Sequence, residues 1–209
     1  MRPAADALPG QGSVQVVVEL VAAVVHERQP DVRRERVGDG AGHRRRREIS
    51  LELLAGSLAI DVKNFGDSGA GYAKSGADHK RFADQVDAVG AAQPDVIVVS
   101  GGRNDVVDDL STLTSAADDL FSELHRKLPS AILVAVAPFW GDSDQPPAIG
   151  SIAGSIKSAV ESAGGQYLNL PDPLHGHPEF MADAADPNDA GYAAIAAALQ
   201  PALAKLLPG

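Results

Sequence analysis

The chain has 209 residues, contains no cysteine and carries a formal net charge of −10 at neutral pH. This length suffices for one domain with its own core, and the shares of 44% hydrophobic and 22% charged residues are ordinary for a globular protein. Without cysteine the chain has no disulfide and no thiolate metal site, and its acidic balance argues against a nucleic-acid partner.

The charge is unevenly distributed. Residues 1–47 hold nine arginines, no lysine and six acidic residues, a balance of +3, which leaves −13 for the rest of the chain. So sharp a shift predicts two parts: an atypical Arg-rich N-terminal segment, 1–47, and a main domain, 48–209.

The N-terminal segment gives little guidance. Val14–Val25 is apolar apart from Gln15 and Glu19, which fits a strand or a short helix. It is too short to span a bilayer, and Glu19 spoils it as a secretory leader, so the cytoplasm is the default expectation. Residues 26–47 have no period and read as a solvated arm without regular structure. The run Arg44–Arg47 could touch phosphate, but such runs are usually only solvated.

From about residue 48 the pattern becomes regular. Apolar spacing predicts a helix over residues 49–58 that Gly56 helps to end, and then a short strand, Ala59–Lys63. A glycine-rich turn, Asn64–Tyr72, follows. The first half ends with a helix through Phe82, Val86 and Val89 and with the strand Val96–Ser100, whose first four residues are all β-branched.

The second half repeats this alternation. Asp108 or Asp109 caps a helix that Pro129 stops, and the remaining elements are a strand Ile132–Ala137, a helix Ile149–Val160, a strand Tyr167–Leu170 and a helix Tyr192–Leu206. Alternating strands and helices predict an α/β fold of three layers, with a central parallel sheet between helices.

Candidate functional residues follow the strand Val96–Ser100. Asn104 lies where ligands bind in open parallel sheets, and its carboxamide can donate an N–H to a developing oxyanion. An Asn-Asp turn that caps the next helix explains the same residues equally well.

Two further loops should meet Asn104 at this edge of the sheet. Gly66–Gly71 can point backbone N–H groups at an anion and offers the Ser68 hydroxyl, although it lacks the G-x-G-x-x-G pattern of dinucleotide sites. Met181–Tyr192 contains Asp183 and Asp186, which share a face if that turn is helical.

Three motifs together resemble the SGNH (GDSL-type) hydrolases. Gly102-Arg-Asn-Asp105 matches their Gly-x-Asn-Asp pattern, the run 64–71 looks like their second block, and the run 183–192 looks like their final Asp-x-x-His-Pro-Asn-x-x-Gly-Tyr block. The resemblance covers residue 48 to the C-terminus. It implies the flavodoxin-like SGNH fold, a small-molecule ester as substrate and no cofactor. It makes Gly69 and Asn104 the oxyanion donors, position 186 the general base and Asp183 the residue that orients it.

Two departures from this pattern affect the chemistry. Asp186 stands where the family has its catalytic histidine, and a carboxylate is a weaker base than imidazole near neutral pH. The family's Gly-Asp-Ser motif is missing before residue 48, where the nearest match is Gly38-Asp-Gly40. A shifted reading frame upstream of residue 48 would explain this loss, and translation of the other frames tests it.

Ser68 belongs to the one Gly-Asp-Ser in the chain, but its surroundings fit the second block better, so we place it as the weaker candidate nucleophile. The histidines of His175-Gly-His177 could supply a base or a metal pair, although loop histidines are more often idle. Asp189 with Asp183 and Asp186 could hold a cation, but acids also gather at a helix N-terminus. Trp140 is expected to pack at the rim.

Two functions follow from these residues. The first is a serine esterase of SGNH type, with little or no activity in this chain because base and nucleophile are out of place. The second is a non-catalytic α/β module that binds a small acyl or glycan ligand. Family members are often secreted, so localisation stays open.

Overall fold

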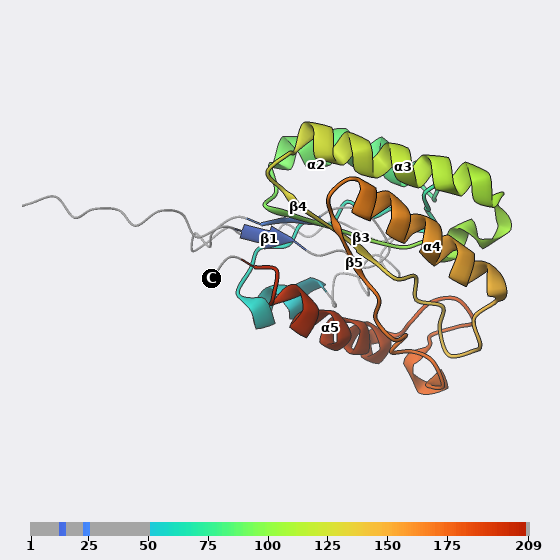
Figure 1. Cartoon of the computed structure of the whole chain (residues 1–209). Helices are drawn as coiled ribbons and strands as arrows, with labels where there is room; N and C mark the ends of the chain where they lie inside the picture. The colour runs from blue at the N-terminus through green and yellow to red at the C-terminus, as the bar shows by residue number, and fades with distance from the viewer. Residues whose placement is uncertain (1–12, 16–22, 26–50, 208–209) are drawn as a thin grey trace, which may run out of the picture.

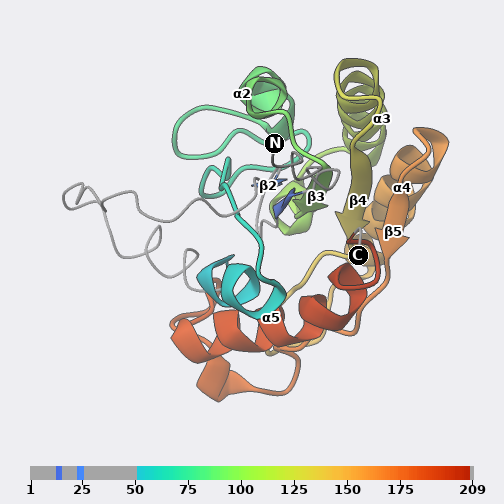
Figure 2. The ribbon, with the colours of Figure 1, turned by 90° about the vertical axis from the view of Figure 1, so that its left-hand side faces the viewer.

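The computed structural model of the chain describes residues 13–15, 23–25 and 51–207, and the statements below concern these residues. Its centre is a parallel sheet of three strands in the order β3-β4-β5, formed by Val96–Ser100, Ile132–Val136 and Gln166–Leu168. In this register Val98 pairs with Val134, and Val134 pairs with Gln166. Figures 1 and 2 show helices on both faces of the sheet, so the predicted three-layer α/β fold is confirmed.

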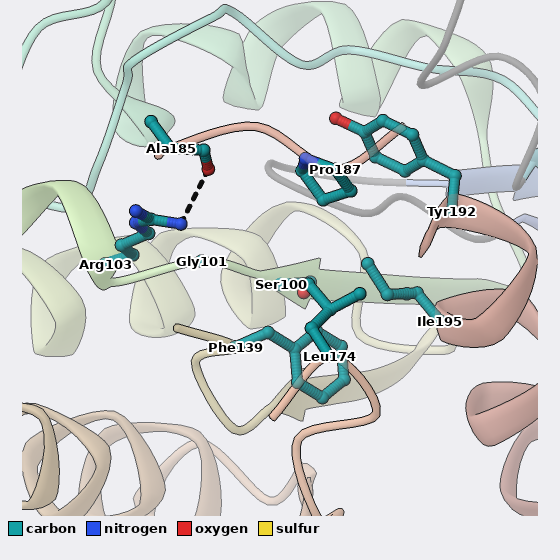
Figure 3. A pocket seen from close by; sticks show the side chains of 9 residues that line it. All are labelled: Ser100, Gly101, Arg103, Phe139, Leu174, Ala185, Pro187, Tyr192 and Ile195. Atoms are coloured by element: carbon teal, nitrogen blue, oxygen red, sulfur yellow. Dashed lines mark hydrogen bonds between the residues drawn. The ribbon is translucent and has the colours of Figure 1, made fainter. Parts of the chain in front are cut away.

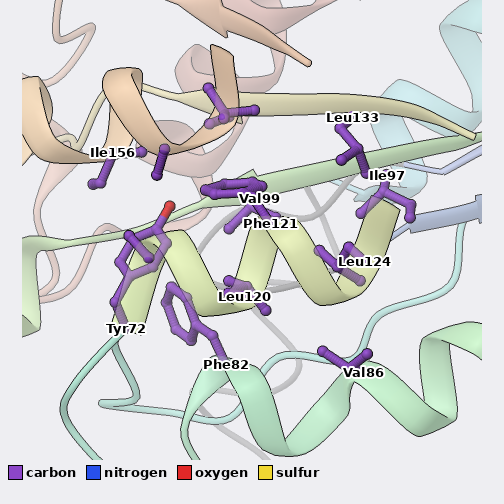
Figure 4. Packing of buried hydrophobic residues seen from close by; sticks show 14 of the residues in the cluster. Tyr72, Phe82, Val86, Ile97, Val99, Leu120, Phe121, Leu124, Leu133 and Ile156 are labelled. Atoms are coloured by element: carbon purple, nitrogen blue, oxygen red, sulfur yellow. The ribbon is translucent and has the colours of Figure 1, made fainter. Parts of the chain in front are cut away.

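The alternation of side chains along the strands builds two cores. Ile97 and Val99 of β3 face the layer of α2, α3 and α4, where they pack with Phe121 and Leu124 (Figure 4). The strand residues between them belong to the other core, which also includes Leu54 of the helix 51–58 and residues of α5. Its members include Val96, Val98, Val134, Val136, Leu54, Ile195 and Leu199. Because β3 is buried on both faces, it reads in the sequence as a continuous apolar run.

The helices lie close to the predicted spans. The helical stretches are residues 51–58, η1 Phe82–Gln85, α2 Val86–Ala92, η2 Arg103–Val107, α3 Leu110–Lys127, α4 Pro147–Ser162, η3 Pro178–Phe180 and α5 Asp189–Leu203. Of the two predicted caps, Asp109 begins α3, where its carboxylate accepts from the N–H groups of Ser111 and Thr112. Asn188 caps α5 in the same way.

One predicted strand is wrong. Residues 59–63 form no ladder with any described residue. Ala59 has a left-handed backbone, with φ 54°, which breaks the extended run, and Ile60 and Val62 pack against the α5-side core. The alternation of Ile60 and Val62 with polar residues therefore reflects an extended segment that lies on the core. Gly56, predicted at the helix end, instead lies within it.

The N-terminal apolar run contains two short strands, β1 Ser13–Gln15 and β2 Ala23–Val25, which pair antiparallel. Both lie beside β3. Gly38-Asp-Gly40 and Arg44–Arg47 fall outside the described residues. Within the described part, no helix combines the length and apolar character needed to cross a membrane.

Candidate active site

The chain turns sharply where β3 ends. Gly101 and Gly102 have φ of 156° and 116°, and a Cβ on Gly102 would lie about 3.0 Å from Ile152, Ile156 and Pro138. A larger residue would therefore clash with α4 and strain the backbone. The two glycines deliver Arg103, Asn104 and Asp105, which form η2, to the carboxyl end of the sheet.

Asn104 contacts the glycine-rich loop. Its Nδ2 donates to the carbonyl oxygen of Ala70 at 2.9 Å. The carboxamide has two N–H groups, and this bond uses one of them. The structure thus brings Asn104 beside the segment that contains Gly69, while the roles of both as oxyanion donors stay predictions.

Asp105 ties the same two segments together. Its buried carboxylate accepts backbone N–H groups from Tyr72, Ala73 and Lys74 at 3.0, 2.8 and 3.1 Å. Burial raises the pKa of Asp105 from its ordinary value, and the three N–H bonds act in the opposite direction. Gly71 is required at this contact, because a Cβ there would lie 2.3 Å from the Asp105 carboxylate.

Gly69 and Ser68 lie half-buried in a turn of this loop. Gly69 has φ of 75°, a conformation that favours glycine, and the buried Asp67 accepts the Asp78 N–H at 3.0 and 3.1 Å through its two oxygens. The Ser68 carbonyl accepts from Ala77 at 2.8 Å. Among the described residues, no histidine or carboxylate bonds to the Ser68 hydroxyl. The described part of the chain therefore shows no base in contact with Ser68, and its role as nucleophile stays a prediction.

Asp183 and Asp186 lie in the turn that precedes α5. The Asp183 Oδ1 accepts the backbone N–H groups of Ala185 and Asp186, both at 2.9 Å, so it shapes its own turn. This turn is not helical. The condition under which the two carboxylates would share a helix face is therefore not met, and their catalytic roles remain predictions.

Arg103 joins the third segment to the first two, a contact that sequence reading missed. Its guanidinium donates to the carbonyl oxygens of Ala185 at 2.7 Å and Ala184 at 3.3 Å, and it lies 4.8 Å from the centre of the Trp140 ring. We call this set of contacts the Arg103 clasp. Trp140 is thus a rim packing residue, as predicted. The predicted meeting of the three loops is also seen.

A second anchoring carboxylate was missed as well. Asp172 accepts from the backbone N–H groups of Trp140, Gly141 and Leu174. It therefore fixes the loop after β4 to the loop after β5. Trp140 and Gly141 lie 32 and 31 positions before Asp172, and only these distant contacts distinguish it from a surface aspartate, so the sequence carried no usable signal.

The two histidines lie on exposed loop positions. The Nδ1 of His177 lies 2.9 Å from Glu179, and its ring stacks on Phe180 with 4.8 Å between centroids. The Nδ1 of His175 lies 3.3 Å from the Ser143 carbonyl oxygen. Within the described part of the chain, no three His, Asp or Glu side chains gather as a metal site would require.

A small cavity opens beside the Arg103 clasp, between the end of β3 and the start of α5 (Figure 3). It measures about 30 Å³ and is lined by Ser100, Gly101, Arg103, Phe139, Leu174, Ala185, Pro187, Tyr192 and Ile195. Its walls are mostly apolar, which is typical of small-molecule sites.

Comparisons with known proteins agree with this geometry. The GDSL-like Lipase/Acylhydrolase family matches residues 35–194. The GDSL lipase Rv0518 of Mycobacterium tuberculosis is 31% identical over an alignment of 168 residues, and the match covers 75% of this chain and 71% of that protein.

Solved structures share the fold at low identity. A family two carbohydrate esterase from Cellvibrio japonicus superposes with a TM-score of 0.59 and 22% identity, over 78% of this chain and 52% of that one. The acetylxylan esterase Axe2 of Geobacillus stearothermophilus, in a catalytic mutant, gives 0.57 and 21%, over 73% and 79%.

Proposed function

Because the chain belongs to the GDSL-like lipase/acylhydrolase family, we propose that the rim beyond β3 is an ester-hydrolase site that this chain uses poorly or not at all. The observation that carries the proposal is the contact of Asn104 with the Ala70 carbonyl, 2.9 Å long, beside Gly69. It supports an intact oxyanion site, whereas the positions of base and nucleophile are altered.

The chemistry of acyl transfer explains the expected weakness. The N–H groups of Gly69 and Asn104 would stabilise the negative charge that develops on the ester carbonyl oxygen. A serine must first lose its proton to a base within hydrogen-bond reach. Position 186 holds a carboxylate, and no Gly-Asp-Ser precedes residue 48. The site can therefore hold the oxyanion but lacks the groups that generate it.

Hydrolysis of p-nitrophenyl acetate by the full chain tests this proposal. We expect turnover close to that of buffer, and equal rates for the chain, for Ser68→Ala and for the control Ser75→Ala, which removes an exposed serine of the same loop. Asp186→His should add no activity, because the nucleophile is still absent. Turnover that disappears in Ser68→Ala, but not in Ser75→Ala, would contradict the proposal and identify Ser68 as the nucleophile.

The cavity at the rim favours a second candidate function, a non-catalytic module for a small acyl or glycan ligand. Thermal stabilisation by acetylated sugars without hydrolysis would support it. Absence of a shift with every ester and acetylated sugar tested would count against it.

A further inference from the structure

The cavity beside the Arg103 clasp combines apolar walls with one charge. Phe139, Leu174 and Ile195 supply apolar surface, and Arg103 is the one charged side chain among the described residues that line it. Figure 3 shows the guanidinium at one end and Ile195 at the other. A ligand that fits must therefore pair an anionic end with an apolar end.

The charge of Arg103 has no carboxylate partner among the described residues, although this part of the chain is rich in acids. Its recorded partners are two carbonyl oxygens and the Trp140 ring. A guanidinium has five N–H groups, and the carbonyls use two of them. Since these contacts fix the guanidinium plane before any ligand arrives, little side-chain entropy is lost on binding an anion.

Ser100 adds a second polar group at the cavity. Ser100 as a whole residue is 2% exposed, and its hydroxyl forms no hydrogen bond with another described residue. A serine hydroxyl can donate one hydrogen bond and accept others, so at a cavity wall it is open to a partner. Ser100 lines the cavity between Arg103 and Ile195 (Figure 3), so a ligand can supply that partner.

We propose that this cavity binds a short-chain aliphatic carboxylate. The carboxylate lies against the free edge of the Arg103 guanidinium and accepts from the Ser100 hydroxyl, and the alkyl end lies between Leu174 and Ile195. A cavity of about 30 Å³ admits roughly two waters, or an alkyl end of similar size, so a long alkyl chain does not fit in it. The apolar walls disfavour phosphate, whose oxygens would lose their water there.

The proposal goes beyond ester hydrolysis, and it can hold whether or not the chain hydrolyses esters. Binding is measured by calorimetric titration and thermal shift at fixed ionic strength, with sodium propionate, with the neutral isostere propionamide and with inorganic phosphate. We expect a saturable rise in melting temperature with propionate alone. Activity plays no part in these readouts, so a negative esterase assay leaves the outcome interpretable.

Three variants locate the site. Arg103→Lys keeps the charge but loses the planar fork, so we expect propionate to bind about tenfold more weakly. Ser100→Val keeps a residue suited to a strand and fills the cavity, so it should abolish binding. Arg126→Lys is the matched control, because Arg126 is an exposed arginine on α3 that pairs with Glu123, and it should change nothing.

Three results would overturn the proposal. Equal stabilisation by propionamide would show that the charge plays no part, and equal binding of phosphate would show that the apolar walls do not select. Unchanged propionate binding in a folded Ser100→Val protein would place the site elsewhere on the molecule.

Discussion

Buried or half-buried aspartates hold the rim together by accepting backbone N–H groups. Asp105 fixes residues 72–74 to η2, and Asp172 fixes the loop after β4 to the loop after β5. Charge-assisted bonds of this kind are stronger than neutral ones. The geometry of the candidate site therefore depends on carboxylates that need not touch a substrate.

Replacing Asp105 by asparagine should destabilise the protein. Asn offers one acceptor oxygen and an NH₂ group, which would face either the Tyr72 N–H or those of Ala73 and Lys74, so at least one buried donor loses its partner. We expect Asp105→Asn to lower the free energy of unfolding by about 1–3 kcal/mol. Urea denaturation measures this, with the exposed neighbour Asp108→Asn as control. Equal effects of the two changes would contradict it.

The same residue gives a pH dependence of defined sign. Burial raises the pKa of Asp105 in the folded protein, so the folded state holds this proton more tightly than the unfolded state. The stability that Asp105 contributes therefore falls as pH rises from about 4, its unfolded value, through the raised folded pKa, and is constant above. The loss of unfolding free energy caused by Asp105→Asn should therefore become smaller as pH rises from 3.5 to 7. A loss that grows with pH would contradict the raised pKa of Asp105.

Sequence reasoning found Asn104 but not the contacts that its neighbours make. Asn104 stands out because it follows the apolar strand Val96–Ser100 closely, at the edge where ligands bind in open parallel sheets. Arg103 and Asp105 act through contacts with residues about 30 to 80 positions away, and no local spacing encodes such partners. The roles proposed for Gly69, Asp183 and Asp186 came from the resemblance to a family, and they await the mutational tests.

At the scale of elements, the prediction succeeded where local pattern and tertiary burial agree. β3 has only β-branched residues in its first four positions and is buried on both faces, and α3 has both an N-cap and a proline stop. Residues 59–63 were misread because alternation of apolar and polar side chains also arises when an extended segment lies along a core. Strand pairing needs a neighbour, and the sequence pattern of one segment does not show it.

Two glycines should respond to alanine in opposite directions. Gly154 lies in the interior of α4 with open space around its Cα, so Gly154→Ala should raise the free energy of unfolding by about 0.5–1 kcal/mol through helix propensity. Gly71→Ala would place a Cβ 2.3 Å from the Asp105 carboxylate and should lower it by about 2–3 kcal/mol. Thermal and urea unfolding measure both. Stabilisation by Gly71→Ala would show that the Asp105 contact is absent.

At the scale of the whole molecule, the composition gave the class and the alternation of elements gave the layers. The parallel order β3-β4-β5 follows from helices that connect successive strands, so three layers could be predicted with no contact known. The cavity could not be predicted, because its lining comes from five separate segments, from residue 100 to residue 195. Only packing brings such positions together.

The net charge of −10 should make stability depend on salt. Like charges repel one another in the compact state, and the recorded ion pairs, such as Arg126 with Glu123, are largely exposed and contribute little. We expect the melting temperature to rise by about 2–4 °C between 10 and about 200 mM NaCl, roughly 1 kcal/mol for a domain of this size. Calorimetry checks this.

A variant with less charge is the control for this salt effect. Asp118→Asn with Asp119→Asn removes two exposed charges from α3, and the response to salt should then be smaller. A melting temperature that falls with added salt would show that attractive pairs outweigh the repulsion.

The Arg103 clasp also indicates where the molecule can be redesigned. Arg103 binds the carbonyl oxygens of Ala184 and Ala185, and every amino acid supplies a carbonyl. Both alanines are exposed beside the cavity, so their side chains can be randomised while the clasp is kept. Proline is unsuitable at 185, because that N–H bonds to Asp183. A library at these two positions would therefore vary ligand choice at the rim with little effect on the scaffold beneath it.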